Sequence, residues 1–300
     1  MAHRNKLLRY NSLSDHLTMA FVWIFTILMV VVILIPLVFV LAASFSSPEA
    51  LLSAKVFLWP VDFTLRGYSM VIEHEMLPTG FKNTFIYAIL GTTINVVMTT
   101  LAAYPLSRKD LKIRNAVMML FAFTMLFNGG MIPTYLLVRN LGMLDTIWAM
   151  VIPNAMAVWN LIITRTYMQT TIPGEMLESA NIDGCDDFTF LWKMVIPLSV
   201  PIIAVNILLY AVGHWNSYFN AMMYLNDNKL YPLQLVLRDV LIQDDTAGMS
   251  MDVTKQLEKQ QTRYLLQYTT IVVGTVPVML LYPFIQRYFV TGMMVGAVKG

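Results

Sequence analysis

Residues 178–197 read ESANIDGCDDFTFLWKMVIP, a polar start followed by a more apolar end, and they separate two long apolar runs. Just before them, Pro173 and Gly174 can begin a helix that has acidic residues near the positive end of its dipole. Gly184 lets the chain turn where a side chain would clash, and a second short helix is expected after it. Pro197 is expected to end this segment. The stretch therefore predicts a helix–turn–helix at a membrane surface.

Polar and apolar side chains of this stretch are expected to lie on opposite faces. The polar face, which includes Glu178, Asn181 and Asp186, is expected to point outward. The apolar side chains that are expected to face back toward the rest of the chain are Leu177, Ile182, Phe188 and Leu191.

The whole chain is too apolar for a soluble domain. Of its 300 residues, 57% are hydrophobic and 13% are charged, compared with roughly 45–50% and about 25% in soluble proteins. The formal charge of +2 does not indicate a nucleic-acid partner, because the basic residues stand in short clusters between apolar runs. Cys185 is the only cysteine, so the chain cannot form an internal disulfide. A lipid bilayer is the expected surrounding.

Six apolar segments are long enough to cross a membrane as helices. None of them contains Asp or Glu, whose insertion into lipid is costly. Backbone groups in lipid must pair within their own segment, which favours helices. The sequence Asn128-Gly129-Gly130 leaves open a break in the third segment. The predicted spans are 20–44, 84–107, 115–137, 147–166, 198–225 and 265–290.

Basic residues flank the second and fourth spans and both chain ends, which predicts that these regions are cytoplasmic. Residues 1–19 and 291–300 are then cytoplasmic ends of a transmembrane domain that covers 20–290. The loops 45–83 and 226–264 are expected outside the cytoplasm, and the second contains an amphipathic stretch, Leu233–Ile242, that predicts a short helix.

The order Glu-Ser-Ala-x-x-Asp-Gly-Cys, followed by Ile-Pro, resembles the EAA loop of binding-protein-dependent ABC permeases. Ser179 and Cys185 stand where that family usually has Ala, and both are small replacements. The resemblance implies an all-α membrane fold of six helices with a MetI-like core. It also implies that residues 172–197 form a coupling helix held in a groove of an ATPase subunit. The residues that match the motif are Glu178, Ser179, Ala180, Asp183, Gly184, Phe188 and Pro197.

The resemblance covers roughly residues 20–300. Within the family, the sequence is similar to the carbohydrate-import group, specifically to the smaller permease of the maltose type. It also resembles permeases for oligosaccharides and polysaccharide fragments. The resemblance implies a bacterial cytoplasmic-membrane location, a paralogous permease subunit, an extracytoplasmic sugar-binding protein, and two ATPase subunits that bind ATP and Mg. The further stretches that carry it are Asn83-Thr84, Gly129–Thr134, Trp215–Tyr218 and Gly296–Gly300.

The sequence contains no energy source of its own. No P-loop motif is present, and His214 is the only ionisable side chain of the proton-relay type within a predicted span. No zinc-protease or Gly-x-Ser-x-Gly motif occurs, so the chain is expected to be neither an enzyme nor a binder of metal or cofactor. Two alternatives remain open: an amphipathic surface helix without a partner, and a channel or scaffold that needs no ATPase. Acidic residues in the loop disfavour contact with anionic lipid.

Amides and aromatic rings cluster in the fifth predicted span, which is the kind of surface that a sugar path requires. Asn residues also join helices, and Trp and Tyr gather at membrane interfaces, so a structural role is the alternative. A peptide or amino acid is the alternative substrate. The candidate path residues are Tyr210, Trp215, Asn216, Tyr218 and Asn220.

Overall fold

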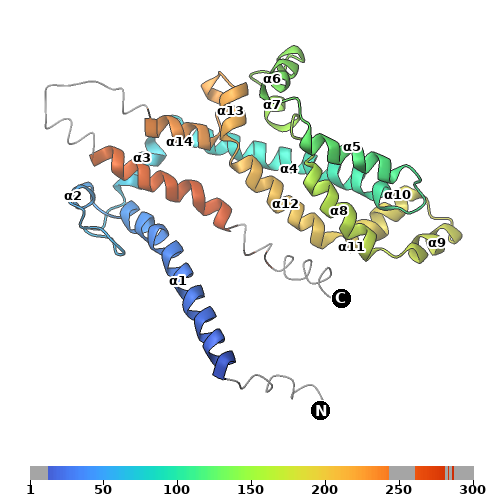
Figure 1. Cartoon of the computed structure of the whole chain (residues 1–300). Coiled ribbons are helices and arrows are strands. Elements are labelled where there is room, and N and C mark those ends of the chain that lie inside the picture. Colours follow the sequence, from blue (N-terminus) through green and yellow to red (C-terminus); the bar gives the residue numbers. More distant parts are fainter. Residues whose placement is uncertain (1–12, 243–260, 281–282, 284–285, 287–300) are drawn as a thin grey trace. The chain divides into compact units, whose positions relative to one another are not determined.

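The computed structural model describes residues 13–242, 261–280, 283 and 286, and the regular elements in these ranges are all helical (Figure 1). The chain forms two compact units. The first unit contains the residues up to Glu73 together with the last helix as far as Val273. The second unit contains the residues from His74 onward together with the last helix from Gly274. Several predicted segments lie wholly or partly outside the described residues, namely 1–19, 226–264, 265–290 and 291–300.

The first unit contains one long apolar helix, which confirms that 20–44 is helical. Its best 18-residue window has a mean hydropathy of 3.3, and none of that window is buried within the chain. A surface this apolar requires lipid or a partner chain. The unit's helices are α1 (Leu13–Ser44), α2 (Pro48–Leu52), α3 (Arg66–Glu73) and the part of the last helix over 261–273.

Small residues allow the short helices of this unit to pack closely. Ala42 and Ala43 at the end of α1 are buried in one cluster with Ala50. At Gly67 on α3, a Cβ atom would lie 2.1 Å from Oγ1 of Thr269 on the last helix. Only glycine therefore permits α3 to lie against that helix at this point.

The second unit is organised around α4 (Leu77–Ser107), which packs most extensively against α12 and α8 (Figure 1). Its remaining elements are α5 (Arg114–Leu126), α6 (Met131–Asn140), α7 (Ile147–Val151), α8 (Val158–Thr171), α9 (Gly174–Ile182), α10 (Asp187–Phe190), a π-helical turn (Leu191–Val195), α11 (Ile196–Leu198), α12 (Val200–Trp215), α13 (Tyr218–Tyr224), a 3-10 turn (Asn228–Leu230) and α14 (Leu233–Ile242). The helix predicted at Leu233–Ile242 is thereby confirmed.

Buried polar side chains join α4 to its neighbours. Nε2 of His214 on α12 lies 2.8 Å from Oδ1 of Asn95 on α4. Gly91 leaves room for this ring, because a Cβ atom there would come within 2.3 Å of His214 Nε2. Asn206 on α12 donates from Nδ2 to Oγ1 of Thr164 on α8 at 2.7 Å. In this structure His214 is a buried residue that joins α12 to α4 through its hydrogen bond with Asn95.

The number of helices that could cross a membrane is smaller than the six predicted segments. Among the described residues, two helices are long and apolar enough, Ser14–Ser44 and Leu77–Ser107, and the number reaches four if two bent pairs each count as one span. The two bends measure 109° between α5 and α6, and 78° between the Asp187–Leu198 segment and α12.

The break that the sequence left open at Asn128-Gly129-Gly130, within the predicted span 115–137, is present between α5 and α6. Asn128 accepts a hydrogen bond from the backbone N–H of Gly130 at its own Oδ1 (3.0 Å), and Gly130 has φ +82°. An Asx-type turn with a left-handed glycine cannot continue a helix. The chain consequently bends by 109° between α5 and α6.

Two more predicted spans are interrupted. Residues 152–157 separate α7 from α8 within 147–166. Within 198–225, the chain bends at Ser199, and α12 ends before Ser217. The helical segment that contains Pro197 ends at Leu198, one residue beyond the predicted end, and Pro201 stands in the first turn of α12, where proline is favourable.

Candidate functional site: the loop between α8 and α12

The helix α9 begins after Pro173, as predicted, and ends in a glycine-containing C-cap. The N–H of Cys185 donates to Ala180 O at 2.9 Å, and the N–H of Gly184 donates to Asn181 O at 3.1 Å. These two bonds form a Schellman motif, in which the residue at the turn takes a left-handed conformation. Gly184 has φ +74° and fills that position.

Gly184 is needed for its backbone conformation and not for close contact. No atom lies within 4 Å of the position that a Cβ would take there. The predicted clash of a side chain at this position was therefore wrong. The left-handed φ alone disfavours other residues, by about 1–3 kcal/mol for a residue that is not glycine.

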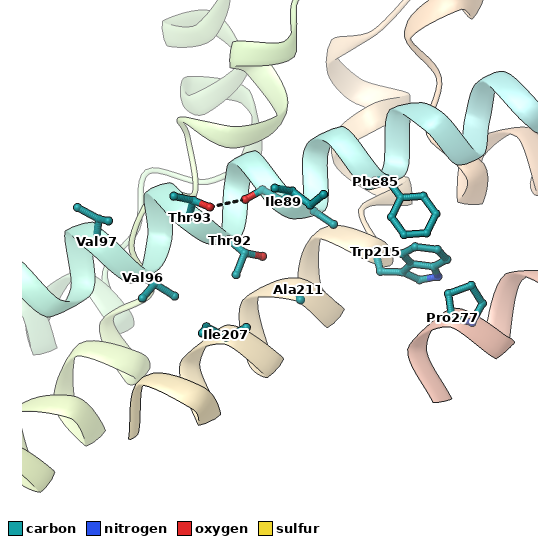
Figure 2. Close-up of a pocket in the computed structure, with 11 residues that line it drawn as sticks. Phe85, Ile89, Thr92, Thr93, Val96, Val97, Ile207, Ala211, Trp215 and Pro277 are labelled. Atoms are coloured by element: carbon teal, nitrogen blue, oxygen red, sulfur yellow. Dashed lines mark hydrogen bonds between the residues drawn. The ribbon is translucent and has the colours of Figure 1, made fainter. Parts of the chain in front are cut away.

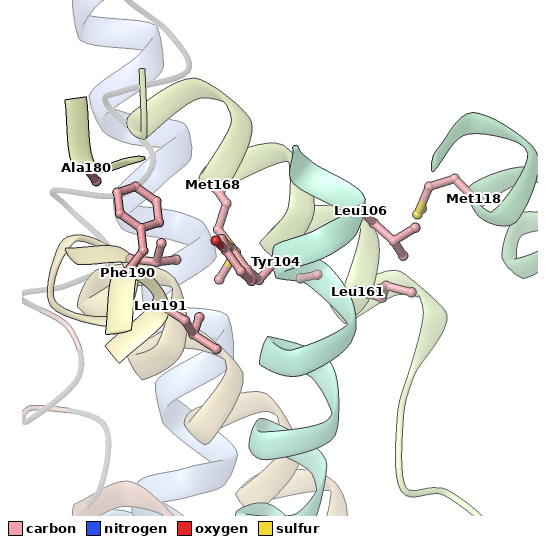
Figure 3. Close-up of a cluster of buried hydrophobic side chains, with 10 residues drawn as sticks. Tyr104, Leu106, Met118, Leu161, Met168, Ala180, Phe190 and Leu191 are labelled. Carbon is pink, nitrogen blue, oxygen red and sulfur yellow. The ribbon is translucent and has the colours of Figure 1, made fainter. Parts of the chain in front are cut away.

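One face of the loop is buried against α4 and α8. Phe190 is 2% exposed, and its ring lies near that of Tyr104 on α4, with 6.5 Å between centroids (Figure 3). Ala180 and Cys185, which close the Schellman motif, belong to the same apolar cluster. The buried members of this cluster, here called the loop core, are Ala103, Tyr104, Leu106, Met118, Leu161, Met168, Ala180, Phe190, Leu191 and Val195.

The opposite face of the loop exposes large apolar side chains. Ile182 is 86% exposed and Phe188 is 69% exposed, and Trp192 is also exposed. The prediction that Ile182 and Phe188 face back toward the chain was wrong, while Leu191 is buried as predicted. The reversal at Gly184 resets the helical phase, so Phe190 takes the inward position that the pattern gave to Phe188.

The other motif residues divide between these two faces. Ala180 is buried in the loop core. The motif residues that are exposed are Glu178, Ser179, Asp183, Gly184 and Pro197. The hydrogen bond with the Thr189 hydroxyl lowers the pKa of Asp186 at the start of α10. The exposed face is thus apolar in its large side chains and acidic around them.

An arginine on the segment after α4 holds the loop by charge. Arg108 pairs with Asp187 on α10 and, at 2.6 Å, with Asp110. Its guanidinium also lies 5.8 Å from the centroid of the Tyr104 ring. The Arg108 hydrogen bond lowers the pKa of Asp110, and the pKa of Arg108 is raised above its ordinary value mainly by that same hydrogen bond.

The sequence indicated Arg108 only as part of a cytoplasmic basic cluster and missed its contact with the loop. No spacing signal links it to Asp187, which lies 79 residues later. A cleft of about 640 Å³ lies beside this ion pair, between the segment after α4 and α9, and Arg108, Glu175 and Glu178 are among its lining residues.

The candidate path residues of the fifth predicted span take different positions. Tyr210 is buried, its hydroxyl lies 2.7 Å from Thr99 Oγ1, and it accepts a bond from the backbone N–H of Ala157 at 3.1 Å. Trp215 is buried and donates from Nε1 to Gly274 O at 2.9 Å. These two side chains join neighbouring helices through their polar atoms.

The remaining three candidates lie at the break between α12 and α13. Asn216 is exposed and donates from Nδ2 to Val212 O at 3.0 Å, within its own helix end. The Tyr218 hydroxyl lies 3.0 Å from the Met222 sulfur, and Asn220 is partly buried. The five candidate residues therefore do not line one common surface in the described structure. Their contact with substrate stays a prediction.

A groove of about 500 Å³ runs between α4, α12 and the last helix (Figure 2). Trp215 packs edge-on against Phe85 in it, with 5.3 Å between ring centroids. Thr93 donates to its own helix at Ile89 O, and the Thr92 hydroxyl has no hydrogen-bond partner within the described chain. A sugar needs many hydrogen-bonding partners, and the side chains that line this groove are mostly apolar. The groove is therefore better suited to contact with hydrocarbon than with a sugar.

No cluster of three or more His, Cys, Asp or Glu residues occurs where the structure is described. The loop between α8 and α12 has one face packed in the loop core and one exposed face that carries Ile182, Phe188 and Trp192.

Comparison with known proteins agrees with this arrangement. Residues 95–295 match the family described as the binding-protein-dependent transport system inner membrane component. The chain belongs to this family, which confirms the family predicted from the EAA motif, and the class of protein is therefore a membrane permease component of an importer.

Individual relatives point to sugar transport. The chain is 40% identical, over 97% of its length and 99% of the relative's, to the polygalacturonan/rhamnogalacturonan transport system permease protein of Bacillus subtilis (strain 168). It is 28% identical, over 81% and 84%, to the melibiose/raffinose/stachyose import permease protein of the same organism. A crystal structure of a bacterial ABC transporter involved in the import of the acidic polysaccharide alginate matches with a TM-score of 0.85 and 31% identity, over 93% of this chain and 99% of that one.

Proposed function

We propose that this chain is the permease subunit of an ATP-driven importer that moves an oligosaccharide delivered by an extracytoplasmic binding protein. The ATP and Mg are bound on two partner ATPase subunits, and a paralogous permease completes the membrane core. The observation that carries the proposal is the loop between α8 and α12, whose back is buried in the loop core while Ile182 and Phe188 are exposed.

The exposed apolar face needs a cover, and a protein groove fits it better than lipid. Asp183, Asp186 and Asp187 are exposed in the same loop, next in sequence to Ile182 and Phe188. Anionic lipid repels such a surface, whereas a membrane-surface helix usually places Lys and Arg beside its apolar face. We therefore assign the coupling role to Glu178, Ser179, Ala180, Asp183, Gly184, Phe188 and Pro197, with Phe188 making the central contact to the ATPase.

The substrate class rests on the relatives. One relative is named for the transport of polygalacturonan and rhamnogalacturonan, and the similar crystal structure is of a transporter that imports alginate. These three polysaccharides all carry carboxylate groups. Fragments of such acidic polysaccharides are the first candidates for the substrate here. Tyr210, Trp215, Asn216, Tyr218 and Asn220 stay proposed path residues, with the exposed Asn216 the best placed of them to meet a passing sugar.

We further propose six membrane crossings with both termini in the cytoplasm of a bacterial cell. The two bent pairs each supply one crossing in this arrangement, and α7 with α8 supplies another. Single cysteines placed in a Cys185→Ser background test this topology by their labelling with an impermeant maleimide. Labelling of a cysteine at Ser53 and not at Lys112 in intact cells is expected, and the reverse pattern would contradict the arrangement.

The transport assignment is tested by uptake into proteoliposomes that hold both permeases, the ATPases and the binding protein. ATP-dependent uptake of labelled oligogalacturonides, above that of a neutral raffinose-type sugar, is the expected result. Uptake of peptides or amino acids, without uptake of sugars, would show that the proposed substrate class is wrong. Uptake that proceeds without any ATPase would indicate a channel and overturn the proposal.

A further inference from the structure

One helix of the second unit is continuous from end to end. α4 has 31 residues, which at about 1.5 Å per residue corresponds to about 45 Å. This length exceeds the hydrocarbon thickness of about 30 Å. Two other helical paths in this unit are broken among the described residues, because α5 meets α6 at 109° and the segment ending at Leu198 meets α12 at 78°.

The N-terminal end of α4 binds the main chain of the segment that precedes α14. Asn83 donates from Nδ2 to Lys229 O at 2.7 Å and to Tyr231 O at 3.0 Å. The Tyr87 hydroxyl donates to Leu230 O at 2.7 Å. Asn83 and Tyr87 are both buried. Three consecutive carbonyl groups of this segment are thus satisfied by one face of α4.

The same end of α4 also fixes the start of α14. Thr84 is fully buried and accepts a hydrogen bond at Oγ1 from the N–H of Leu233, the first residue of α14, at 2.8 Å. At Gly80, a Cβ atom would lie 3.2 Å from the Cα of Leu233, so the two backbones approach closely. The segment 228–236 is therefore attached to α4 by both polar and packing contacts.

The C-terminal end of α4 binds the loop between α8 and α12. Tyr104 packs against Phe190 in the loop core, and Arg108 directly after the helix pairs with Asp187. Arg108 and Asn83 stand 25 residues apart on one rod, so about 37 Å separates the two attachments. The same helix thus holds two segments that are distant in sequence and lie at its opposite ends.

We propose that α4 transmits the state of the segment 228–236 to the coupling loop, with Asn83 and Arg108 as its positioning residues. This inference rests on the proposed function, in which the loop lies against the ATPase, and on the predicted location of residues 226–264 outside the cytoplasm, on the side where the binding protein docks. A rigid helix fixed at both ends moves as one body, so docking outside shifts the loop inside. The interrupted helices beside it cannot pass a displacement in this way.

The test uses the full importer in nanodiscs and measures how strongly loaded binding protein stimulates ATP hydrolysis. Asn83→Leu removes both bonds to the outer carbonyls, and Arg108→Gln removes the ion pair with Asp187. Each variant is expected to reduce the maximal stimulation about fivefold or more, the lower range of ordinary allosteric coupling. Arg108→Lys keeps the charge and is expected to restore part of the stimulation.

The double variant separates transmission from two independent defects. If both ends act through α4, Asn83→Leu with Arg108→Gln lowers stimulation no further than the stronger single variant. Distant residues that act independently give the product of the two effects instead, and that product would overturn the inference. Unchanged stimulation in either single variant would overturn it as well.

Two controls keep the result interpretable. Lys109→Gln removes a neighbouring exposed charge that forms no hydrogen bond or ion pair with the described residues of the loop, and it is expected to keep native stimulation. The amount of ATPase that purifies with each variant reports assembly, and Tyr87→Phe serves as a milder outer variant if Asn83→Leu does not assemble. A native complex without stimulation or sugar uptake would reject the proposed function itself, separately from the role of α4.

Discussion

The two ends of α4 hold their partners by different chemistry. At one end, Asn83, Thr84 and Tyr87 are buried and form neutral hydrogen bonds with main-chain atoms. At the other, the loop is held by an apolar core and by Arg108, whose partner Asp187 is 65% exposed at its side chain. Neutral buried bonds respond little to salt, whereas an exposed ion pair is screened. The strength of the attachment at Asn83 is therefore expected to be independent of salt, and the strength of the attachment at Arg108 is expected to depend on salt.

The largest effect is expected in the loop core. Phe190→Ala removes a side chain that is 2% exposed, and a buried Phe→Ala change costs about 3–5 kcal/mol. Phe188→Ala, two residues earlier and 69% exposed, is expected to change stability by less than about 0.5 kcal/mol. Thermal unfolding of the purified permease pair compares them. Equal losses would show that the two phenylalanines are not on opposite faces.

At the other end of α4, Asn83→Leu is expected to destabilise by about 1–3 kcal/mol, because the two hydrogen bonds from the buried Asn83 amide to main-chain carbonyl groups are lost. The same unfolding measurement, repeated at low and high salt, should give the same loss at both. A loss that vanishes in high salt would contradict a neutral, buried attachment.

Gly184 tests whether the loop turn depends on conformation or on space. Gly184→Val places a β-branched residue at φ +74° and is expected to cost about 1–3 kcal/mol and to uncouple ATP hydrolysis from uptake. Gly184→Asn, a residue that tolerates this conformation, is expected to keep most of the coupling, because no atom obstructs its Cβ. Equal defects in both variants would indicate that bulk, and not φ, is what the site excludes.

Arg108→Gln is expected to cost at most about 1 kcal/mol of stability, and this loss should decrease as salt is added. Because Arg108 lowers the pKa of Asp110, the pair contributes fully above the ordinary carboxyl pKa of about 3.9 and is lost as the pH falls through the lowered value. Unfolding midpoints between pH 7 and pH 3 measure this. A contribution that grows as the pH falls would contradict the assignment.

Much of the chain's organisation could be predicted from local sequence signals. Pro173 and Gly184 act on the backbone beside them, so the start and end of α9 followed from the sequence. Hydropathy predicted α1 and α4 because both are continuous apolar helices. Hydropathy did not predict the turn at Asn128–Gly130, because side-chain-to-backbone bonding ends that helix without lowering the apolar content.

Other features depend on tertiary contacts that no local pattern contains. The exposure of Phe188 and the burial of Phe190 follow from a left-handed turn that resets the helical phase, and a single-helix pattern cannot register that change. Arg108 and Asp187 meet only because α4 and α10 pack together. Trp215 has the aromatic character of a sugar contact, yet its Nε1 hydrogen bond to Gly274 O is visible only in the folded chain.

The capture of the ATPase by the exposed face of the loop tests the central claim most directly. The double variant Ile182→Ser with Phe188→Ser makes that face polar and leaves the loop core unchanged. Leu141→Ser is the control, because Leu141 is also an exposed apolar residue but lies on the opposite predicted side of the membrane. The amount of ATPase that purifies with the permease pair should fall sharply in the double variant, together with sugar uptake, and should stay native in the control. Stoichiometric ATPase and native uptake in the double variant would contradict the coupling role of this loop.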